Sequence, residues 1–318
     1  GAIFESTLNP ETRRSGGMHY TSIENIHKVI DPLFLNDLRA ELDTILAISQ
    51  EKRRNQALRD YQQRLASLRF LDPACGSGNF LTETFLSLRR LENECLKALL
   101  NDQSALDFFD DRIFVNIHQF YGIEINDFAA TVAKTALWIA ESQMVNETAK
   151  ILARDIDFLP LKSYSNIIEG NALTLDWNEV CPASELNYII GNPPFVGARL
   201  MTQEQKNDLT PLFAGCKNIG NLDYVGGWYM KAAQMMQTNS TIRTALVSTN
   251  SIAQGEQPAI LWTPLLQMGM HIDFAHRTFR WDSEASIKAH VHCVIIGFSK
   301  TATKQKYIFE SEQAQAVK

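Results

Sequence analysis

The segment from Gly191 to Phe195, with the sequence GNPPF, combines residue types that could hold a polar ligand at a rigid turn. It follows a mostly apolar run at 186–190, which is typical of a short buried strand. Each proline lacks an N–H and disfavours a helical conformation in the residue before it, so the turn is extended and stiff. The turn therefore offers the Asn192 side-chain oxygen, the Pro193 carbonyl and an aromatic ring at the carboxyl end of a strand, where open α/β sheets bind ligands.

A second candidate site is the turn from Asp72 to Phe80, DPACGSGNF, after the run LRFLD. Gly76 and Gly78 would let the backbone approach a ligand closely. A dinucleotide-binding G-x-G-x-x-G motif needs a small third residue where this chain has Leu81, and a carboxylate before the glycines would repel a pyrophosphate. That carboxylate suits a ligand with an ammonium and a sulfonium group, such as S-adenosylmethionine.

Glu124, at the end of the run FYGIEI, is the third polar residue at a strand end. An acidic residue in this place can accept hydrogen bonds from both ribose hydroxyls of a nucleoside. A Gly-x-Gly turn or a Pro-Pro pair alone is most often only a tight turn. Together, Asp72, the glycine pair and Glu124 predict a site for a nucleoside-containing cofactor.

These turns must be brought together by a sheet. The β-like runs are LRFLD (68–72), FYGIEI (120–125), NIIEG (166–170), NYIIG (187–191), TALVST (244–249), HIDFA (271–275) and VHCVIIGF (291–298). Helical patterns occupy 22–67, where Asp31-Pro32 marks a start, then 79 to about 100, and a stretch from Asp127 with Phe128 and Ile139 on its apolar face. Alternating strands and helices predict an α/β fold with a doubly wound, mostly parallel sheet. No helix separates the last two runs, which predicts an antiparallel strand at one edge.

Composition excludes several protein classes. The 318 residues have ordinary globular composition, and their net charge of −6 gives no general attraction to nucleic acid, so a nucleic-acid partner would require a local basic cluster. Five scattered cysteines without a C-x-x-C pair predict reduced thiols, a cytoplasmic location and no zinc site. No apolar run reaches the roughly 18 residues of a membrane span.

The motifs DPACGSGNF, YGIEIN, EGNAL and GNPPF, in this order, resemble those of amino-directed DNA methyltransferases of the γ arrangement. The segments GMHYTSIENIHKVI, DYVGGWYMKAA, STNSIAQGEQ and RTFRWDSEAS further resemble the methyltransferase core of single-chain type IIG (type IIL) restriction–modification enzymes. The resemblance covers about 13–298 and implies a Rossmann-like class I methyltransferase fold. It also implies a helical segment at 1–67, a catalytic domain at 68–300, and a tail at 301–318 leading toward a target-recognition domain.

The same resemblance implies S-adenosylmethionine as the cofactor. Tyr20 and Thr21 would close over its methionine part, Glu124 would bind the ribose, and Ile125 would lie against the adenine. Asn171 stands where the family often has an aspartate, and its neutral amide could still pair with the exocyclic amine of the adenine. The full set implied for the cofactor is Tyr20, Thr21, Asp72, Ala74, Gly76, Gly78, Asn79, Phe80, Glu124, Ile125, Asn171, Ala172 and Asn192.

The catalytic residues implied are Asn192, Pro193, Pro194 and Phe195. An adenine amine is a poor nucleophile because its lone pair is delocalised, and two acceptors on its N–H groups would pull the nitrogen toward tetrahedral geometry. The substrate implied is an N6 amine of an adenine flipped out of double-stranded DNA, with Phe195 stacked on the base. Phe279 or Trp281 could cover its other face, and the basic residues around Arg280 could contact DNA.

Other activities are compatible with the GNPPF turn. Similar motifs occur in enzymes that methylate guanine amines in RNA or glutamine side chains in proteins, and a silent module that only binds cofactor is a third alternative. The HYTS segment and the form of the DPACGSGNF loop favour the DNA enzymes. In the parent protein, we expect this chain to be covalently linked to a target-recognition domain, and a nuclease domain is a further candidate partner. We expect no membrane partner and no metal.

Overall fold

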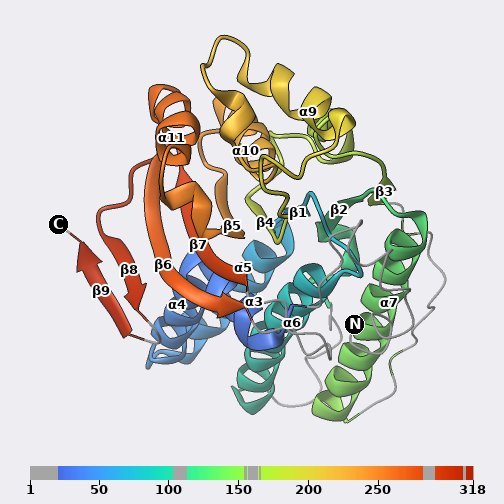
Figure 1. Ribbon diagram of the computed structural model, residues 1–318. Helices are drawn as coiled ribbons and strands as arrows, with labels where there is room; N and C mark the ends of the chain where they lie inside the picture. The colour runs from blue at the N-terminus through green and yellow to red at the C-terminus, as the bar shows by residue number, and fades with distance from the viewer. Residues whose placement is uncertain are drawn as a thin grey trace.

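The computed structural model describes residues 21–102, 113–153, 156, 164, 166–281, 291–310 and 313–317, in which one mixed sheet carries helices on both faces (Figure 1). The helices are α3 (Ile23–Ile30), α4 (Asn36–Leu46), α5 (Glu51–Ser67), α6 (Asn79–Asp102), α7 (Asp127–Leu152), α8 (Trp177–Val180), α9 (Gln203–Leu209), α10 (Gly226–Thr238) and α11 (Gln257–Gln267). The strands are β1 (Phe70–Asp72), β2 (Phe120–Glu124), β3 (Ile167–Glu169), β4 (Tyr188–Gly191), β5 (Arg243–Thr249), β6 (His271–Trp281), β7 (Val291–Ser299), β8 (Lys306–Glu310) and β9 (Gln313–Val317). Among these residues, no helix has the length and apolar character needed to cross a bilayer.

The strand order β3-β2-β1-β4-β5-β7-β6-β8-β9 places β1 and β4 side by side. The pairings among β1 to β5 are parallel, whereas β7 runs antiparallel to both β5 and β6. The chain winds outward from β1 through β2 and β3, and in the other direction through β4 and β5, so the crevice where ligands bind lies between β1 and β4. The predicted doubly wound, mostly parallel sheet with an antiparallel strand toward one edge is confirmed. Beyond β6, the structure adds two strands that the sequence did not predict, β8 and β9.

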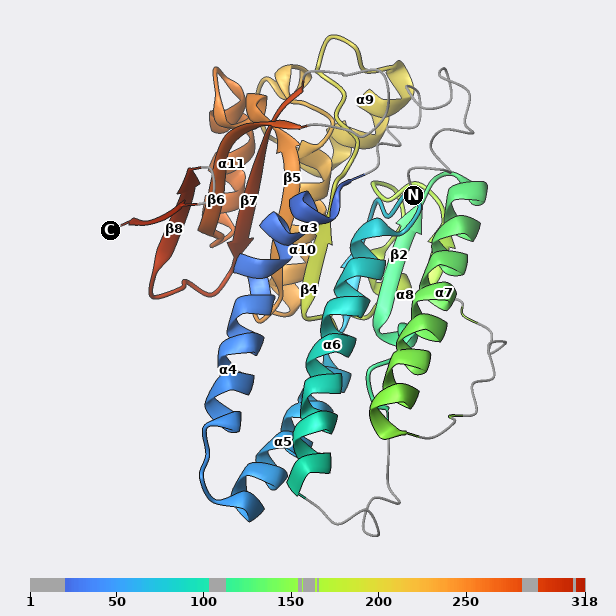
Figure 2. The same cartoon turned by 90° about the horizontal axis from the view of Figure 1, so that it is seen from below.

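Two hydrophobic cores cover the two faces of the sheet. One core joins the sheet to α3, α4, α5, α6 and α7, and contains the parallel-stacked rings of Phe70 and Phe120, whose centroids are 5.2 Å apart. The second core joins the opposite face to α8, α10 and α11, around Trp177, Tyr229 and Leu261. Figures 1 and 2 show these two helical layers on either side of the strands. The sheet edge with the candidate turns is thus held from both faces.

The predicted N-terminal helical segment is confirmed, but no α-helix begins at Asp31-Pro32. These residues lie in a π-helical turn, η1 (Asp31–Leu35), that joins α3 directly to α4. The earlier start is at Ser22, whose hydroxyl accepts a hydrogen bond from the Asn25 N–H at 3.3 Å. Proline is tolerated at η1 because the wider turn accommodates its missing N–H.

Helix α7 buries a different face from the one its large apolar residues predicted. Phe128 and Ile139 are 55% and 54% exposed, while the buried side carries alanines such as Ala129 and Ala133. Small side chains let α7 approach closely, and a Cβ added to Gly78 would lie 3.0 Å from the Cα of Ala133. The face of α7 that carries the small residues packed on the glycine turn is therefore the buried one.

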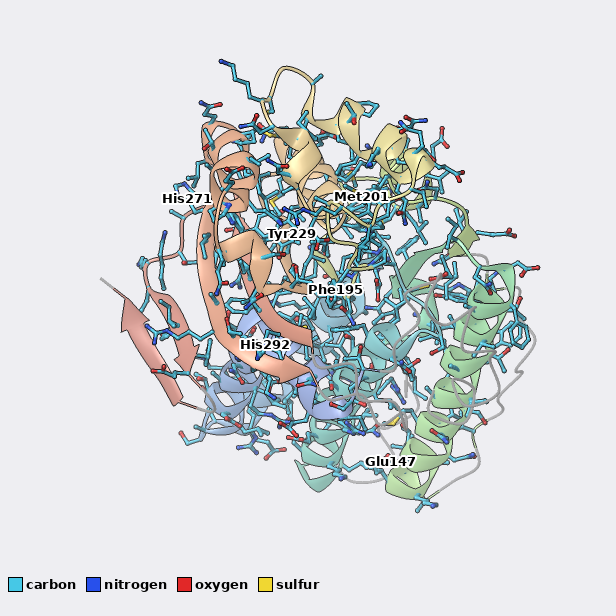
Figure 3. All side chains as sticks on the ribbon, in the orientation of Figure 1. Glu147, Phe195, Met201, Tyr229, His271 and His292 are labelled. Carbon is cyan, nitrogen blue, oxygen red and sulfur yellow. The ribbon has the colours of Figure 1, made fainter. Side chains whose placement is uncertain are left out.

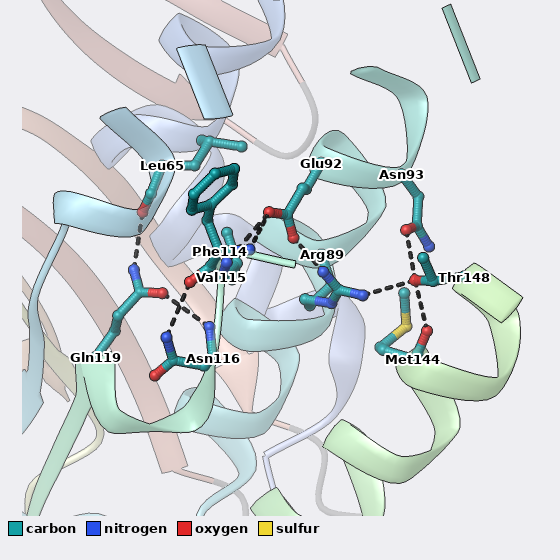
Figure 4. Close-up of polar contacts among 10 residues, drawn as sticks. All are labelled: Leu65, Arg89, Glu92, Asn93, Phe114, Val115, Asn116, Gln119, Met144 and Thr148. Atoms are coloured by element: carbon teal, nitrogen blue, oxygen red, sulfur yellow. Dashed lines mark hydrogen bonds and ion pairs between the residues drawn. The ribbon is translucent and has the colours of Figure 1, made fainter. Parts of the chain in front are cut away.

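A buried polar network joins α6 to α7 and to the segment before β2 (Figure 4). Arg89 and Glu92 form an ion pair that is almost fully excluded from solvent. Arg89 also donates to the Thr148 hydroxyl at 2.6 Å, and Glu92 accepts from the backbone N–H groups of Phe114 and Val115 at 2.7 and 3.2 Å. Both charges are hydrogen-bonded as well as paired, which offsets the desolvation that burial imposes. The network therefore anchors the segment that leads into β2.

Candidate active site

Asn192 follows β4 directly and presents a buried acceptor. Its Nδ2 donates to the hydroxyl of Thr21 at 3.4 Å, which lies just before α3 and is only 3% exposed. Its Oδ1 is buried without a hydrogen-bond partner among the residues that the structure describes. Because the Thr21 hydroxyl takes the amide N–H, the oxygen is the end of the amide left to receive a donor. Buried polar atoms are normally paired, so this acceptor indicates a place for a ligand.

Asp72 lies beside the same turn, at the end of β1. The side chain is 1% exposed and accepts from the Ala74 N–H at 3.0 Å. Burial raises its pKa to about 8, and the nearby carboxylate of Glu124 contributes to the rise. A Cβ added to Gly191 would lie 2.4 Å from Oδ1 of Asp72, so only glycine lets the two strand ends meet this closely. No positive side chain among the described residues contributes to the pKa of Asp72, so this buried carboxyl group would gain from a cationic ligand.

Glu124 joins the glycine turn to the start of α7 through its two carboxylate oxygens. Oε2 accepts from the Gly76 N–H at 2.9 Å, and Oε1 accepts from the Asn126 N–H at 3.0 Å. Gly76 has a φ of +53° and Gly78 a φ of +81°, which favour glycine at both positions. Burial raises the pKa of Glu124. Each oxygen keeps a further lone pair, which could accept from a ligand hydroxyl.

The next loop, after β3, lies against Glu124, whose carbonyl accepts from the Gly170 N–H at 2.8 Å. Beside it, Ile125 is 62% exposed and Ala172 is buried. The Asn171 amide is engaged at both ends, because Oδ1 accepts from the Leu173 N–H at 2.9 Å and Nδ2 donates to Asp208 at 2.8 Å. The exposed isoleucine could support a flat ring, while the asparagine oxygen is used by its own loop.

The remaining residues of the first turn pack in the core or begin a helix. Phe80 is buried in the core under the turn, and Asn79 begins α6. Ala74 packs partly buried on the opposite core. These residues shape the turn from Asp72 to α6, where their sequence predicted a cofactor loop.

Asp223 was not singled out by sequence reasoning, although it lies in the quoted segment DYVGGWYMKAA. It is 2% exposed, and Oδ1 accepts from the N–H groups of Val196 and Val225 at 3.2 and 3.1 Å. Its other oxygen accepts from the Thr249 hydroxyl at 3.3 Å. Asp223 therefore ties the residue after Phe195 to α10 and to the end of β5. The sequence signal that could have revealed Asp223 is an aspartate shortly before a helix, here α10.

Phe195 comes from the turn after β4 and lies at the centre of the view in Figure 3. It is partly buried and packs against both cores, which leaves part of the ring accessible. Of the two aromatics considered for the opposite face of a base, Phe279 is partly buried, with the Nζ of Lys28 5.1 Å from its ring centroid. Tyr20 and the side chain of Trp281 lie outside the described residues.

The basic residues around Arg280, which were expected to contact DNA, are only partly described. Arg277 pairs with Glu310 at 2.8 Å, and Arg199 is exposed in the loop after the GNPPF turn. The side chain of Arg280 lies outside the described residues. Both of these positive groups are therefore on the surface, and Arg277 is paired with a carboxylate.

Comparison with known proteins agrees with this geometry. Solved structures include the type IIL restriction–modification enzyme MmeI in complex with DNA, which is 44% identical, has a TM-score of 0.91 and is matched over 99% of this chain and 42% of its own. The "DNA methyltransferase A" of Bacillus subtilis strain 168 is 41% identical over 322 residues, which are 100% of this chain and 35% of that protein. The putative type II restriction enzyme and methyltransferase RM.MjaORFECS2P of Methanocaldococcus jannaschii is 28% identical over 172 residues, 54% of this chain and 14% of that protein.

These relatives are longer than the chain, which spans 35% of the Bacillus subtilis protein and 42% of the MmeI chain. The family model described as "MmeI, DNA-methyltransferase domain" matches residues 48–310. This match includes β1 to β7, the turns with Asp72, Glu124 and Asn192, and strand β8. The chain therefore belongs to the MmeI DNA-methyltransferase domain family.

Proposed function

We propose that this chain transfers a methyl group from S-adenosylmethionine to the exocyclic N6 amine of an adenine in double-stranded DNA, as the modification part of a restriction–modification enzyme. Membership of the MmeI DNA-methyltransferase domain family supports the reaction class. The relative MmeI, described in complex with DNA, supports DNA as the partner. A DNA substrate and five free thiols both fit the reducing cytoplasm.

The buried Oδ1 of Asn192 is the observation that carries the proposal. Thr21 fixes the amide, and the Pro193 carbonyl lies on the same stiff turn, so the two acceptors are preorganised. Two acceptors on one planar amine hold the nitrogen in place and direct its lone pair away from the ring. No strong base is required before attack, because the proton can leave after the new bond forms. Orientation of nitrogen, methyl carbon and sulfur in line then provides much of the rate.

The residues around β1 and β2 fit the proposed cofactor, which supplies an electrophilic methyl group on a sulfonium when bound. Asp72 would pair with the ammonium of its amino acid end, since the buried carboxyl group gains from a positive charge beside it. Glu124 would accept from the ribose hydroxyls, and Ile125 would support the adenine. Gly76 leaves the backbone of the turn uncovered, since a Cβ added there would meet nothing within 4 Å, and Gly78 lets the turn pack closely on α7. Phe195 would stack on the flipped base.

Transfer of a labelled methyl group to DNA, RNA and a glutamine-bearing protein, in parallel, tests the proposal. We expect label in DNA as N6-methyladenine, with the rate about 10²- to 10³-fold lower in Asn192→Ala, because one preorganised acceptor is lost. Asn207→Ala is the matched control, since Asn207 is an exposed asparagine on α9. Calorimetric binding of S-adenosylmethionine should stay within a few-fold of the unaltered protein in both variants. Label in RNA or protein alone, or full activity of Asn192→Ala, would contradict the proposal.

A further inference from the structure

A carboxylate on α9 lies beside the loop after β3. Asp208 accepts with the same oxygen, Oδ2, from the Asn171 amide at 2.8 Å and from the Tyr224 hydroxyl at 3.2 Å. Its other oxygen, Oδ1, has no donor among the residues that the structure describes. Asp208 is half-buried, so this oxygen belongs to a side chain that is held in place but still reachable.

The position of the cluster relates it to the cofactor site. The β3 loop that carries Asn171 hydrogen-bonds Glu124 through Gly170, at 2.8 Å. On the other side, Tyr224 contacts the ring of Trp228 edge-on, with centroids 5.2 Å apart, and the indole N–H of Trp228 donates to the Pro73 carbonyl at 3.0 Å. The cluster is thus linked through direct contacts to both strand-end turns that would hold the cofactor.

Asn171 itself is poorly suited to receive an exocyclic amine. Its Oδ1 accepts from the N–H of Leu173 in its own loop, and its Nδ2, which points away from that bond, can only donate. An adenine amine is also a donor, so the amide nitrogen would oppose it. The acceptor available beside this loop is the carboxylate that Asn171 and Tyr224 hold in place.

We propose that Asp208 is the residue that recognises the adenine of the cofactor, accepting a hydrogen bond from its exocyclic amine with Oδ1, while Asn171 and Tyr224 hold the carboxylate. This assignment rests on the proposed use of S-adenosylmethionine. It makes α9, which follows the catalytic turn in sequence, part of the cofactor site, and it gives Asn171 a positioning role. The ligand chemistry recognised is a 6-amino purine rather than a 6-oxo purine.

Two ligands that differ at this one group test the assignment by titration calorimetry. S-adenosylhomocysteine carries the 6-amino group, and S-inosylhomocysteine carries an oxygen in its place. We expect the unaltered chain to prefer the adenine ligand about ten- to a hundredfold, the range for one hydrogen bond to a charged group. In Asp208→Asn, the two donors would retain the amide oxygen and turn the amide N–H₂ toward the ligand. The preference should then disappear or reverse.

Glu204→Gln is the matched control, because it removes the same charge from the first turn of the same helix at an exposed position. It should keep the full preference. Tyr224→Phe should reduce the preference partly, since one of the two donors that hold Asp208 is lost. An unchanged preference in Asp208→Asn, or equal weakening of both ligands, would overturn the assignment and leave Asp208 as a link between α9 and the β3 loop. Failure of the unaltered chain to bind S-adenosylhomocysteine would overturn the proposed function together with this assignment.

Discussion

Asp72 predicts a proton-linked affinity for the cofactor. Its pKa is raised to about 8 by burial, so at pH 7 the carboxyl group of the free protein is ~90% protonated. The α-amino group of an amino acid ligand remains largely charged at this pH. An ammonium ion bound next to Asp72 favours the carboxylate, so binding should release about 0.9 protons per cofactor at pH 7. Between pH 6 and pH 7 the ionised fraction rises from ~1% to ~9%, and the dissociation constant should fall about tenfold.

Calorimetry in two buffers of different ionisation enthalpy measures this proton release directly. Asp72→Asn should weaken binding and abolish the release, which separates Asp72 from Glu124, whose pKa burial also raises. The folding stability of the free protein should change with pH in the opposite direction to the cofactor affinity. A raised carboxyl pKa means that the folded state holds a proton that the unfolded state has lost, so stability should fall as the pH rises from about 4 to about 8.

The reasoning would be refuted by a dissociation constant that does not change between pH 6 and 7, with no proton released. Such a result would mean that Asp72 is already ionised in the free protein or does not meet the ammonium. Proton release that persists in Asp72→Asn would assign it to another group. Thermal unfolding followed across the same pH range, with and without cofactor, provides an independent check of the sign.

Three further predictions concern single residues. Gly191→Ala should abolish cofactor binding because its Cβ would lie 2.4 Å from Asp72, whereas Gly197→Ala, where a Cβ meets nothing within 4 Å, should bind normally by calorimetry. Phe195→Ala should lower the rate of methylation of duplex DNA about tenfold or more, because base stacking of about 1–3 kcal/mol is lost, while cofactor affinity is kept. Phe195→Tyr should restore the rate, and equal rates for the two variants would exclude stacking. Arg89→Met should lower the free energy of unfolding, measured with denaturant, by about 3–5 kcal/mol because it leaves a buried carboxylate unpaired, and a change below 1 kcal/mol would contradict this.

Strands that consist of a short apolar run were predictable from the sequence. β4 ends at Gly191, before the two prolines, and β5 spans Arg243–Thr249, close to the predicted 244–249. Asp72 and Glu124 were predictable for the same reason, because a carboxylate after a buried run marks the end of the strand. The structure brings both to neighbouring strands, with Asp72 opposite Gly122 in the register of β1 and β2.

Partners contributed by distant segments could not be predicted. Phe128 and Ile139 were expected on the buried face of α7. In the structure both are exposed, and the face with Ala133 packs against the glycine turn. Asp208 had no sequence signal, since its role depends on a side-chain contact with Asn171 across 37 residues. Strands β8 and β9 are short, and their conformation depends on pairing with distant or neighbouring strands: β8 pairs with β6, and β9 pairs with β8.

The contact between Thr21 and Asn192 joins residues 171 positions apart in the chain. α3, which follows Thr21, also packs against β5 and β7. A helix made early during synthesis therefore docks on strands that leave the ribosome much later, and such distant contacts slow folding. The Asn192 amide acquires its orientation only when this docking is complete, so we expect a nascent or partly folded chain to hold the motif without the geometry that the proposed methyl transfer requires.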